Sequence, residues 1–322
     1  MPKQETVTLD RQDSPKFMTV EEFAEFLEDN GRPLAGKHLR FRKDTIRFEG
    51  DYSRADGRDG NEYQILGFRK RPNGGNRLWI SEKEAVEYLE HLKSMSVELT
   101  YEDVQTVVKE YQSVLRRPRK KGMRGDRNFT GKVEDEIRGK LAEEGLSKFC
   151  KKVYGISFPP HYEPLEPGQM RDQGDFDHML VEMDGVEKDI PLPENMKIAV
   201  KSTAGYFSFA VPENEWNWPG SIYIAVRPHL NQNFLLRLMN KALDLEDFEL
   251  NATVGWLEVD GYITKQEMER QAYVGKRLPG AYHGRIRDWD LRNYIMHPLQ
   301  IHRTLDEFKS LLNRYLQFAK TA

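Results

Sequence analysis

Apolar residues recur at every third or fourth position in six stretches of the chain, which is the spacing of an amphipathic helix. These stretches are 18–31, 81–95, 100–115, 129–155, 263–272 and 302–320. In four of them the helix start carries a capping box, in which a Ser or Thr and a Glu three positions later bond each other's backbone amides. The boxes are Thr19–Glu22, Ser81–Glu84, Thr264–Glu267 and Thr304–Glu307. The longest stretch predicts one long helix, with a break near Gly145 as the alternative.

Other stretches alternate apolar and polar residues or are almost continuously apolar, as β-strands are. The strand candidates are 38–50, 62–71, 174–183, 197–203, 205–211, 221–230 and 252–263. Turns are predicted at 73–75 and at Asp184-Gly185, where Asn, Asp and Gly tolerate the required backbone angles. From residue 130 onward the order is a helix, several strands and a final helix. This order predicts an α/β core in which helices cover a mixed sheet.

The chain divides into four parts by composition. Residues 1–16 are polar and predict a flexible N-terminal segment, while 17–115 predict a smaller accessory α+β domain that could recognise DNA. Residues 116–129 form a basic linker, because 116–127 hold seven basic residues and one acid. Residues 130–322 predict the larger α/β domain.

Whole-chain composition excludes several classes of protein. With 31% charged and 11% aromatic residues in 322 positions, the chain is typical of a folded globular protein. The net charge of −3 does not favour nucleic acid by itself, and the single Cys150 excludes an intrachain disulfide. We find no secretory signal and no run of about 18 apolar residues that would span a membrane. We therefore expect a cytoplasmic protein without a membrane partner.

Lys201 stands out because it interrupts an otherwise apolar strand. Asp177, with Asp175 in reserve, precedes a neighbouring strand, and Glu134 lies near the start of the long helix. Carboxylate oxygens suit Mg²⁺, and the ion lowers the pKa of a bound water and stabilises charge on a phosphate. A lysine ammonium can orient or deprotonate that water and balance the charge. Together these residue types are those that a magnesium-dependent phosphodiesterase needs.

GDFD at 174–177, followed by KIAVKST at 197–203, resembles the core motif of the PD-(D/E)XK nuclease superfamily. The later runs EW, IYIAV and VGWLEVDGYITKQEM extend the resemblance over residues 130–310, but not over 1–115. The resemblance implies a restriction-endonuclease-like mixed sheet flanked by helices. It also implies a Mg²⁺-dependent endonuclease of the type II restriction kind, which cuts double-stranded DNA as a homodimer. The implied catalytic residues are Glu134, Asp177 and Lys201, and the implied metal ligands are Asp175, Asp177, Glu134 and Glu215.

One position departs from the motif. The family usually places Asp or Glu two residues before the lysine, where this chain has Ala199. Glu134 from the helix, or Glu213 or Glu215 from the segment after the strand, could supply that acid from elsewhere. If none does, the chain is a catalytically silent DNA-binding or structural protein of the same fold, and this alternative stays open.

Each of these residues also has an ordinary structural interpretation. Lysine often guards a sheet edge against pairing with another chain, so Lys201 could simply be solvated. Asp175 and Asp177 could be turn acids, and Glu134 could be an acid favoured by the dipole at a helix N-terminus. The order and spacing of the four residues favour the nuclease interpretation.

Two basic segments are candidates for DNA contact. The linker could neutralise phosphates, and 275–294 mixes five Arg and Lys residues with aromatic residues that stack on bases. The predicted DNA-binding residues are Arg116, Arg117, Arg119, Lys120, Lys121, Arg124, Arg285 and Arg287. Both segments could equally be solvated surface loops. The region 17–95 could instead be a dimerisation or protein-binding module, because its helices are acidic.

Overall fold

The computed structural model describes a large part of the chain. The described residues are 17–36, 62–63, 68–70, 78–110, 129–160, 175–202, 209–213, 221–231, 233–275, 293–296 and 301–322. Residues 1–16, the predicted strand 38–50, the predicted turn at 73–75, residues 116–128 of the basic linker, Glu215, Arg285 and Arg287 lie outside them. Phe129, the last residue assigned to the linker, is the first residue of the long helix.

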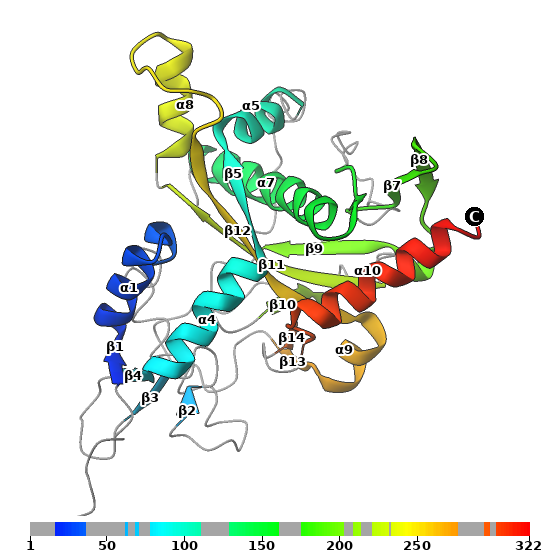
Figure 1. Cartoon of the computed structure of the whole chain (residues 1–322), viewed down its shortest axis with the longest axis horizontal. Coiled ribbons are helices and arrows are strands. Elements are labelled where there is room, and N and C mark those ends of the chain that lie inside the picture. Colours follow the sequence, from blue (N-terminus) through cyan, green and yellow to red (C-terminus); the bar gives the residue numbers. More distant parts are fainter. Residues whose placement is uncertain are drawn as a thin grey trace, which may run out of the picture.

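A mixed sheet forms the centre of the molecule (Figure 1). Its strand order is β5-β12-β11-β9, with bounds Ser96–Thr100, Thr253–Thr264, Ile222–Leu230 and Ile198–Ser202. β9 runs parallel to β11, whereas β11 and β5 are antiparallel to β12. The predicted mixed sheet is therefore present, and helices cover it.

The main apolar core lies on one face of this sheet. It contains side chains from α5 (Tyr101–Glu110), α7 (Phe129–Tyr154) and α10 (Leu305–Ala319). α7 is one continuous helix, so the alternative of a break near Gly145 is wrong. A Cβ at Gly145 would come within 2.8 Å of the Leu257 side chain, because the helix approaches the sheet closely there. The glycine therefore serves helix–sheet packing.

The N-terminal region covers part of the opposite face. It consists of the strands β1 (Phe17–Thr19), β2 (Glu62–Tyr63), β3 (Phe68–Lys70) and β4 (Leu78–Ser81), with the helices α1 (Val20–Asp29) and α4 (Glu82–Ser94). The strands form an antiparallel sheet in the order β1-β4-β3-β2. α4 leads directly into β5, the edge strand of the central sheet. The sequence analysis assigned residues 96–110 to the accessory domain. In the structure they belong to the central sheet and the main core of the larger domain.

A second layer covers the rest of that face. Its elements are α9 (Lys265–Gln271) and a three-stranded sheet of β10 (Phe209–Pro212), β14 (Asn293–Met296) and β13 (Tyr273–Gly275). The strand candidates 197–203 and 205–211 therefore contribute to two different sheets, because β9 pairs with β11 and β10 pairs with β14. Apolar residues between the layers form a separate small core, which includes Ala199, Tyr223 and Ile263.

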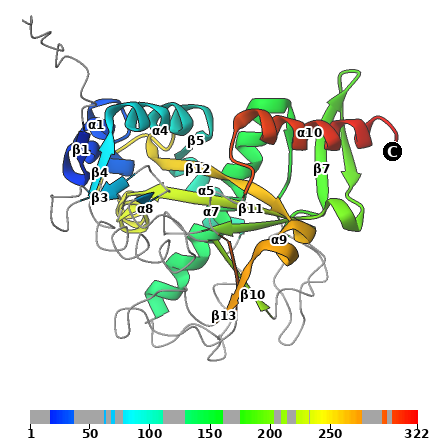
Figure 2. The same cartoon turned by 90° about the horizontal axis from the view of Figure 1, so that it is seen from below.

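A three-stranded antiparallel sheet projects from the far end of the molecule, opposite the β1–β4 sheet (Figure 2). It contains β6 (Ile156–Ser157), β7 (His178–Met183) and β8 (Val186–Pro191). The predicted turn between β7 and β8 is confirmed, with positive φ angles of 56° at Asp184 and 75° at Gly185. A short 3-10 helix, Glu194–Met196, then leads into β9.

Helix α8 (Phe234–Ala242) lies on an arm at the end of the β11–β12 pair, beside α5 (Figure 1). All four predicted capping boxes are present, at α1, α4, α9 and α10. In the part of the chain that the structure describes, every helix is too short or too polar to cross a membrane.

Candidate active site at the edge of the central sheet

The outer edge of β9 is where Asp175 approaches the strand that carries Lys201. β11 occupies one side of β9, and on the other side Phe176 forms an isolated antiparallel bridge with Ile198. The amide of Phe176 donates to the carbonyl of Ile198 (3.1 Å), and the amide of Ile198 donates back (3.2 Å). Both side chains are fully buried in the main core, so the bridge is firmly held.

Asp175 continues along this edge with its side chain. Its Oδ2 accepts a hydrogen bond from the backbone amide of Val200 at 2.7 Å. That amide points to the same edge as the amide of Ile198, two residues earlier, because alternate amides of a strand point the same way. The carboxylate therefore lies directly beside the strand position that precedes Lys201.

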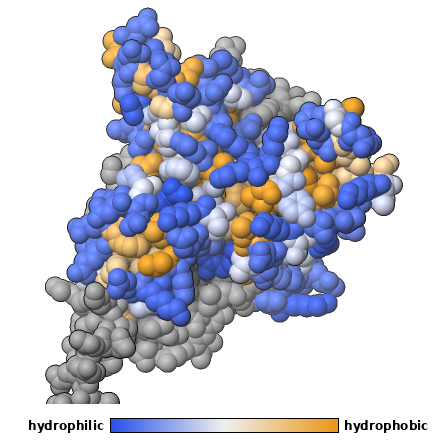
Figure 3. All heavy atoms as spheres, in the orientation of Figure 1, coloured by the Kyte–Doolittle hydropathy of each residue, from blue (hydrophilic) through white to orange (hydrophobic). Residues whose placement is uncertain are grey.

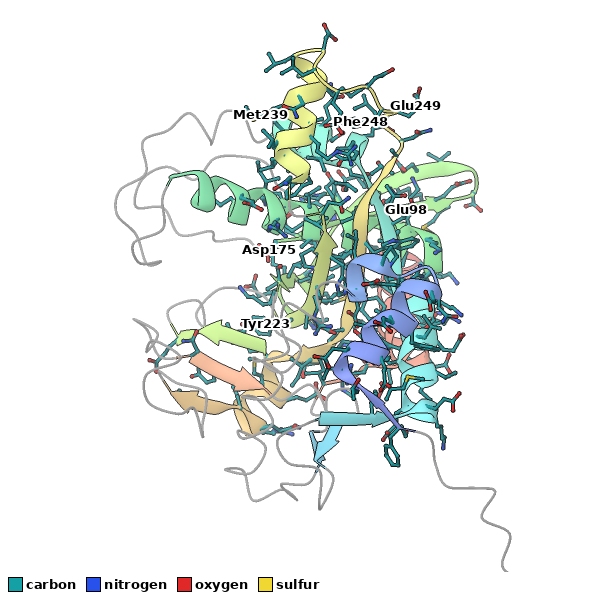
Figure 4. The ribbon with its side chains drawn as sticks, turned by 90° about the vertical axis from the view of Figure 1, so that its left-hand side faces the viewer. Glu98, Asp175, Tyr223, Met239, Phe248 and Glu249 are labelled. Carbon is teal, nitrogen blue, oxygen red and sulfur yellow. The ribbon has the colours of Figure 1, made fainter. Side chains whose placement is uncertain are left out.

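Lys201 lies on the side of β9 that faces the second layer. Ala199 belongs to the small core there, and residues two apart on a strand point to the same face. In the parallel register Tyr223 lies beside Ala199, and Ala225 lies beside Lys201. Lys201 is half-buried, and Asp175 is half-buried as well. Figure 4 shows Asp175 and Tyr223 in the same part of the molecule, beside the central sheet.

The position of the absent family acid is apolar in this chain. Ala199 is 4% exposed and packs among Val211, Tyr223, Ala225 and their neighbours in the small core. An ionised carboxylate at such a position would lose its hydration without gaining a partner. The local packing therefore explains why alanine is accommodated here, and this position supplies no carboxylate.

The other predicted site residues have different surroundings. Glu134 is partly exposed and accepts hydrogen bonds from its helix neighbour Arg138, with Nη2 at 2.7 Å. Asp177 is buried, its carbonyl accepts from the amide of Leu192 at 2.6 Å, and His178 Nε2 lies 3.9 Å from its carboxylate. The reserve residue Asp175 has a carboxylate that accepts a hydrogen bond from β9. Glu213, at the end of β10, is exposed.

The oxygen donors at this edge suit a hard cation such as Mg²⁺. Magnesium is usually held by one or two carboxylates, while water and substrate phosphate oxygens complete its octahedral shell. The Asp175 carboxylate, which accepts from the Val200 amide, is the acid that lies at this edge. Among the described residues, no three His, Cys, Asp or Glu side chains gather closely enough to hold a metal. The fit is therefore to an ion held mainly by Asp175, not to a preformed cage of several carboxylates.

A second polar cluster, which the sequence analysis missed, lies on the same sheet face beneath α4. Glu258 on β12 is its centre and is fully buried. Its Oε2 accepts from Arg227 Nη1 and from His229 Nε2, both at 2.8 Å, and Tyr88 of α4 donates to its carboxylate at 3.2 Å. Arg227 Nη2 also donates to Asp260 at 2.7 Å. Asp260 is the extra residue of a β-bulge between β11 and β12, which aims its side chain at Arg227.

The environment of this buried cluster shifts the pKa of three groups. Burial raises the pKa of Asp260 to about 7, against the attraction of Arg227. Burial lowers the pKa of His91, which lies 3.6 Å from Glu258, to about 4. Burial alone would raise the pKa of Glu258, but attraction to Arg227 and the hydrogen bond from His229 outweigh it and hold that pKa below its usual value. The cluster therefore keeps one ionised carboxylate under α4.

A pattern of alternating charged residues in the sequence could have predicted this cluster. Arg227 and His229 alternate along one apolar strand, and Glu258 and Asp260 alternate along the next. Residues two apart lie on one strand face, so opposite charges on neighbouring strands predict cross-strand pairs. We interpret the cluster as the link between α4 and the sheet, because its side chains are almost fully buried.

Comparison with models of protein families, with curated proteins and with solved structures found no match to this chain. The candidate site is accordingly interpreted from its own residues and their geometry.

Proposed function

We propose that this chain is a Mg²⁺-dependent endonuclease that hydrolyses phosphodiester bonds of double-stranded DNA at the outer edge of β9. In this proposal the central sheet is the restriction-endonuclease-like core that the resemblance to the PD-(D/E)XK superfamily implies. The hydrogen bond between the Val200 amide and the Asp175 carboxylate carries the proposal. It holds a carboxylate against the backbone of β9 one residue before Lys201, and the proposal requires that the Lys201 ammonium reaches the same ion and phosphate.

The roles of the two side chains follow from their chemistry. Hydrolysis adds one water across a P–O bond: the water oxygen bonds to phosphorus, the ester bond breaks and the leaving oxygen gains a proton. Asp175 would hold the magnesium ion, which when bound acidifies a water and neutralises charge on the phosphate. Lys201 would orient the water or balance the negative charge that grows on the phosphate oxygens. Glu134 is bound to Arg138 through Oε1 and would have to reach the ion with its other oxygen.

A second candidate function is DNA binding without cleavage. Ala199 motivates it, because that buried position supplies no ligand where the family usually has one. In this case Asp175 would serve only to satisfy the Val200 amide, and Lys201 would contact a phosphate directly. Both candidates predict DNA binding that weakens with salt, since lysine and arginine release counterions from phosphates. They differ in whether the strands are cut.

Purified protein should therefore be incubated with supercoiled plasmid in Mg²⁺ and in EDTA. We expect nicked or linear product only in Mg²⁺, and loss of product with Lys201→Ala and with Asp175→Asn. Asparagine keeps an oxygen that can accept from Val200 and removes the charge that a cation requires, so Asp175→Asn should fold normally. Thermal unfolding of each variant should confirm this.

Matched controls separate the site from general charge effects. Lys188→Ala on β8 and Asp184→Asn in the turn before it change exposed residues of the same types and should leave cleavage unchanged. If the parent binds DNA but never cuts it in Mg²⁺, the binding-only candidate replaces the nuclease. If Lys201→Ala and Asp175→Asn cut as fast as the parent, the site is wrongly assigned.

A further inference from the structure

His302 lies where β12 meets the starts of α9 and α10 (Figure 1). Its backbone forms an isolated bridge with Tyr262, in which the His302 amide donates at 2.8 Å and its carbonyl accepts at 2.9 Å. The imidazole stacks on the Tyr262 ring, with the two centroids 4.7 Å apart. Gly261 permits this close approach, because a Cβ there would clash with the His302 carbonyl. These contacts hold the imidazole in a defined position.

Each ring nitrogen of His302 lies against a carboxylate. Nε2 is 3.0 Å from Glu267 Oε1 in α9, and Nδ1 is 3.2 Å from Glu307 Oε1 in α10. An ionised carboxylate only accepts hydrogen bonds, and a neutral imidazole carries a single N–H. The imidazolium carries two N–H groups, so only the protonated ring can bond both acids at once. A neutral ring would bond one acid and turn a lone pair towards the other.

Both carboxylates are fixed by the helices that they cap. Glu267 Oε2 accepts from the amide of Thr264, and Glu307 Oε2 accepts from the amide of Thr304, both at 2.9 Å. Each acid thus uses one oxygen for its own capping box and the other for His302. Because the capping bonds restrain the acids, the charge of the imidazole decides how strongly it attracts them.

The surroundings favour the protonated ring. Burial alone would lower the pKa of His302, but the hydrogen bonds and charges of Glu267 and Glu307 outweigh it and raise that pKa above its ordinary value. Burial alone would raise the pKa of both acids. The capping bonds and the bonds from His302 outweigh it, so the pKa of Glu267 is lowered and that of Glu307 falls to about 2. The three groups therefore stabilise one another's charged forms.

Other ionisable groups face this junction from the same elements. Tyr262 of β12 stacks on the ring, and burial raises the pKa of its hydroxyl, so it stays neutral near neutral pH. Arg314 in α10 acts on Tyr262, and Arg303 acts on Asp260 of the buried cluster. Arginine keeps its charge at any such pH. Among the described groups at the junction, His302 is therefore the one whose charge changes in this range.

We propose that His302 is a pH-sensitive clamp, which joins α9 to the start of α10 while the ring is protonated and loosens when it is neutral. α9 also carries Met268, a fully buried residue of the small core that contains Ala199. Loosening of α9 would therefore reach the second layer, which covers the face of β9 that carries Lys201. The inference goes beyond the proposed nuclease activity and does not depend on it, because it concerns a conformational equilibrium.

The pH range of the clamp follows from the directions of the pKa shifts. A histidine with a raised pKa stabilises the fold fully below its ordinary value of about 6.5, and this contribution is lost as the pH rises through the raised value. The two glutamates, whose pKa values are lowered, contribute fully above about 4.3. The clamp is therefore strongest between about pH 4.3 and 6.5. The His302 side chain is 35% exposed, and Figure 3 shows a largely hydrophilic surface over α9, so water can exchange the proton.

Titration of the His302 ring in the full chain by nuclear magnetic resonance tests the electrostatic part of the inference. We expect a pKa above about 6.5 in the parent and a lower pKa in both Glu267→Gln and Glu307→Gln. Glutamine can take the place of glutamate in a capping box, so both variants should keep their helices. Glu22→Gln is the control, because it changes the same capping box at the start of α1, away from the junction (Figure 1). It should leave the pKa of His302 unchanged.

Hydrogen exchange of the α9 amides tests the conformational part, since exchange reports local opening. The parent and His302→Gln should be compared with each other at about pH 5.5 and again at about pH 9, on either side of the ordinary histidine pKa. We expect slower α9 exchange in the parent at the lower pH and a much smaller difference at the higher pH. Titration of Asp260 occurs in both proteins and cancels in this comparison.

An α9 exchange difference that is absent, or equal at the two pH values, would overturn the inference. So would a His302 pKa at or below about 6.5 in the parent, or one that neither glutamine variant lowers. The titration of the parent needs no substitution, so the clamp stays testable even if a variant fails to fold. Neither measurement involves DNA cleavage, so failure of the clamp and failure of the nuclease proposal are separate results.

Discussion

Replacing Glu258 with glutamine removes one negative charge from the centre of the buried cluster beneath α4. Glu258 is fully buried and receives hydrogen bonds from Arg227, His229 and Tyr88. Glutamine has the same shape, but its amide cannot compensate the Arg227 guanidinium. Removing one partner of a buried ion pair typically costs about 3–5 kcal/mol, because the other charge is left uncompensated. Asp260 still pairs with Arg227, so we expect a loss near the lower end, about 3 kcal/mol.

Urea unfolding followed by far-ultraviolet circular dichroism measures this loss directly. A change of about 3 kcal/mol is a large part of a typical total stability of about 5–15 kcal/mol. Glu87→Gln is the control, because Glu87 forms an exposed pair with Lys83 on the surface of α4. Such surface pairs contribute little, so the control should change stability by less than about 0.5 kcal/mol. A loss of less than about 1 kcal/mol for Glu258→Gln would refute the interpretation of the cluster as a buried ionic link.

Two further predictions concern stability. Burial raises the pKa of Asp260 to about 7, so the folded state binds the Asp260 proton more tightly than the unfolded state does. The contribution of this group to the free energy of unfolding therefore decreases as the pH rises from about 4 to about 7. Relative to the parent, Asp260→Asn should therefore gain up to about 1.4 kcal/mol per pH unit across that window, and a constant difference in unfolding free energy would contradict this. In α7, Gly145→Ala should destabilise by about 1–3 kcal/mol, because its Cβ would meet Leu257 at 2.8 Å. Gly139→Ala has nothing within 4 Å and should stabilise by up to about 1 kcal/mol, so equal shifts in the melting temperatures of the two variants would contradict the packing of α7.

Local patterns in the sequence predicted the helices well, because a helix is specified by residues close to one another. The capping boxes at Thr19, Ser81, Thr264 and Thr304 each begin a helix in the structure. Gly145 was ambiguous, since a glycine lowers helix propensity but also permits close packing. Only the contact with Leu257, more than a hundred residues away in sequence, distinguishes these two roles.

Strand pairing was harder to predict, because pairing depends on residues distant in sequence. β5 was overlooked between two helices, although it forms the edge of the central sheet by pairing with β12. β9 and β10 are adjacent in sequence but pair with different strands. Without knowledge of these partners, the sequence could suggest a mixed sheet but not its strand order.

The candidate site was also hard to predict, because its geometry depends on contacts between residues that are distant in sequence. The spacing in GDFD allowed either aspartate to approach β9, and the sequence analysis favoured Asp177. In the structure the carbonyl of Asp177 bonds to Leu192, and the Asp175 carboxylate bonds to Val200. The bridge between Phe176 and Ile198 fixes the register, which leaves the Asp175 carboxylate beside the Val200 amide, and the catalytic role of Asp177 stays a prediction. A register of this kind cannot be read from one strand alone.

Cleavage of supercoiled plasmid by the Asp175→Asn protein tests the central claim most directly. The parent should nick or linearise the plasmid in Mg²⁺ and leave it intact in EDTA, and Asp175→Asn should bind the DNA with similar affinity but leave it uncut in both. An Asp175→Asn protein that cuts in Mg²⁺ at the rate of the parent would contradict the assignment of this carboxylate as the metal-binding acid of a nuclease.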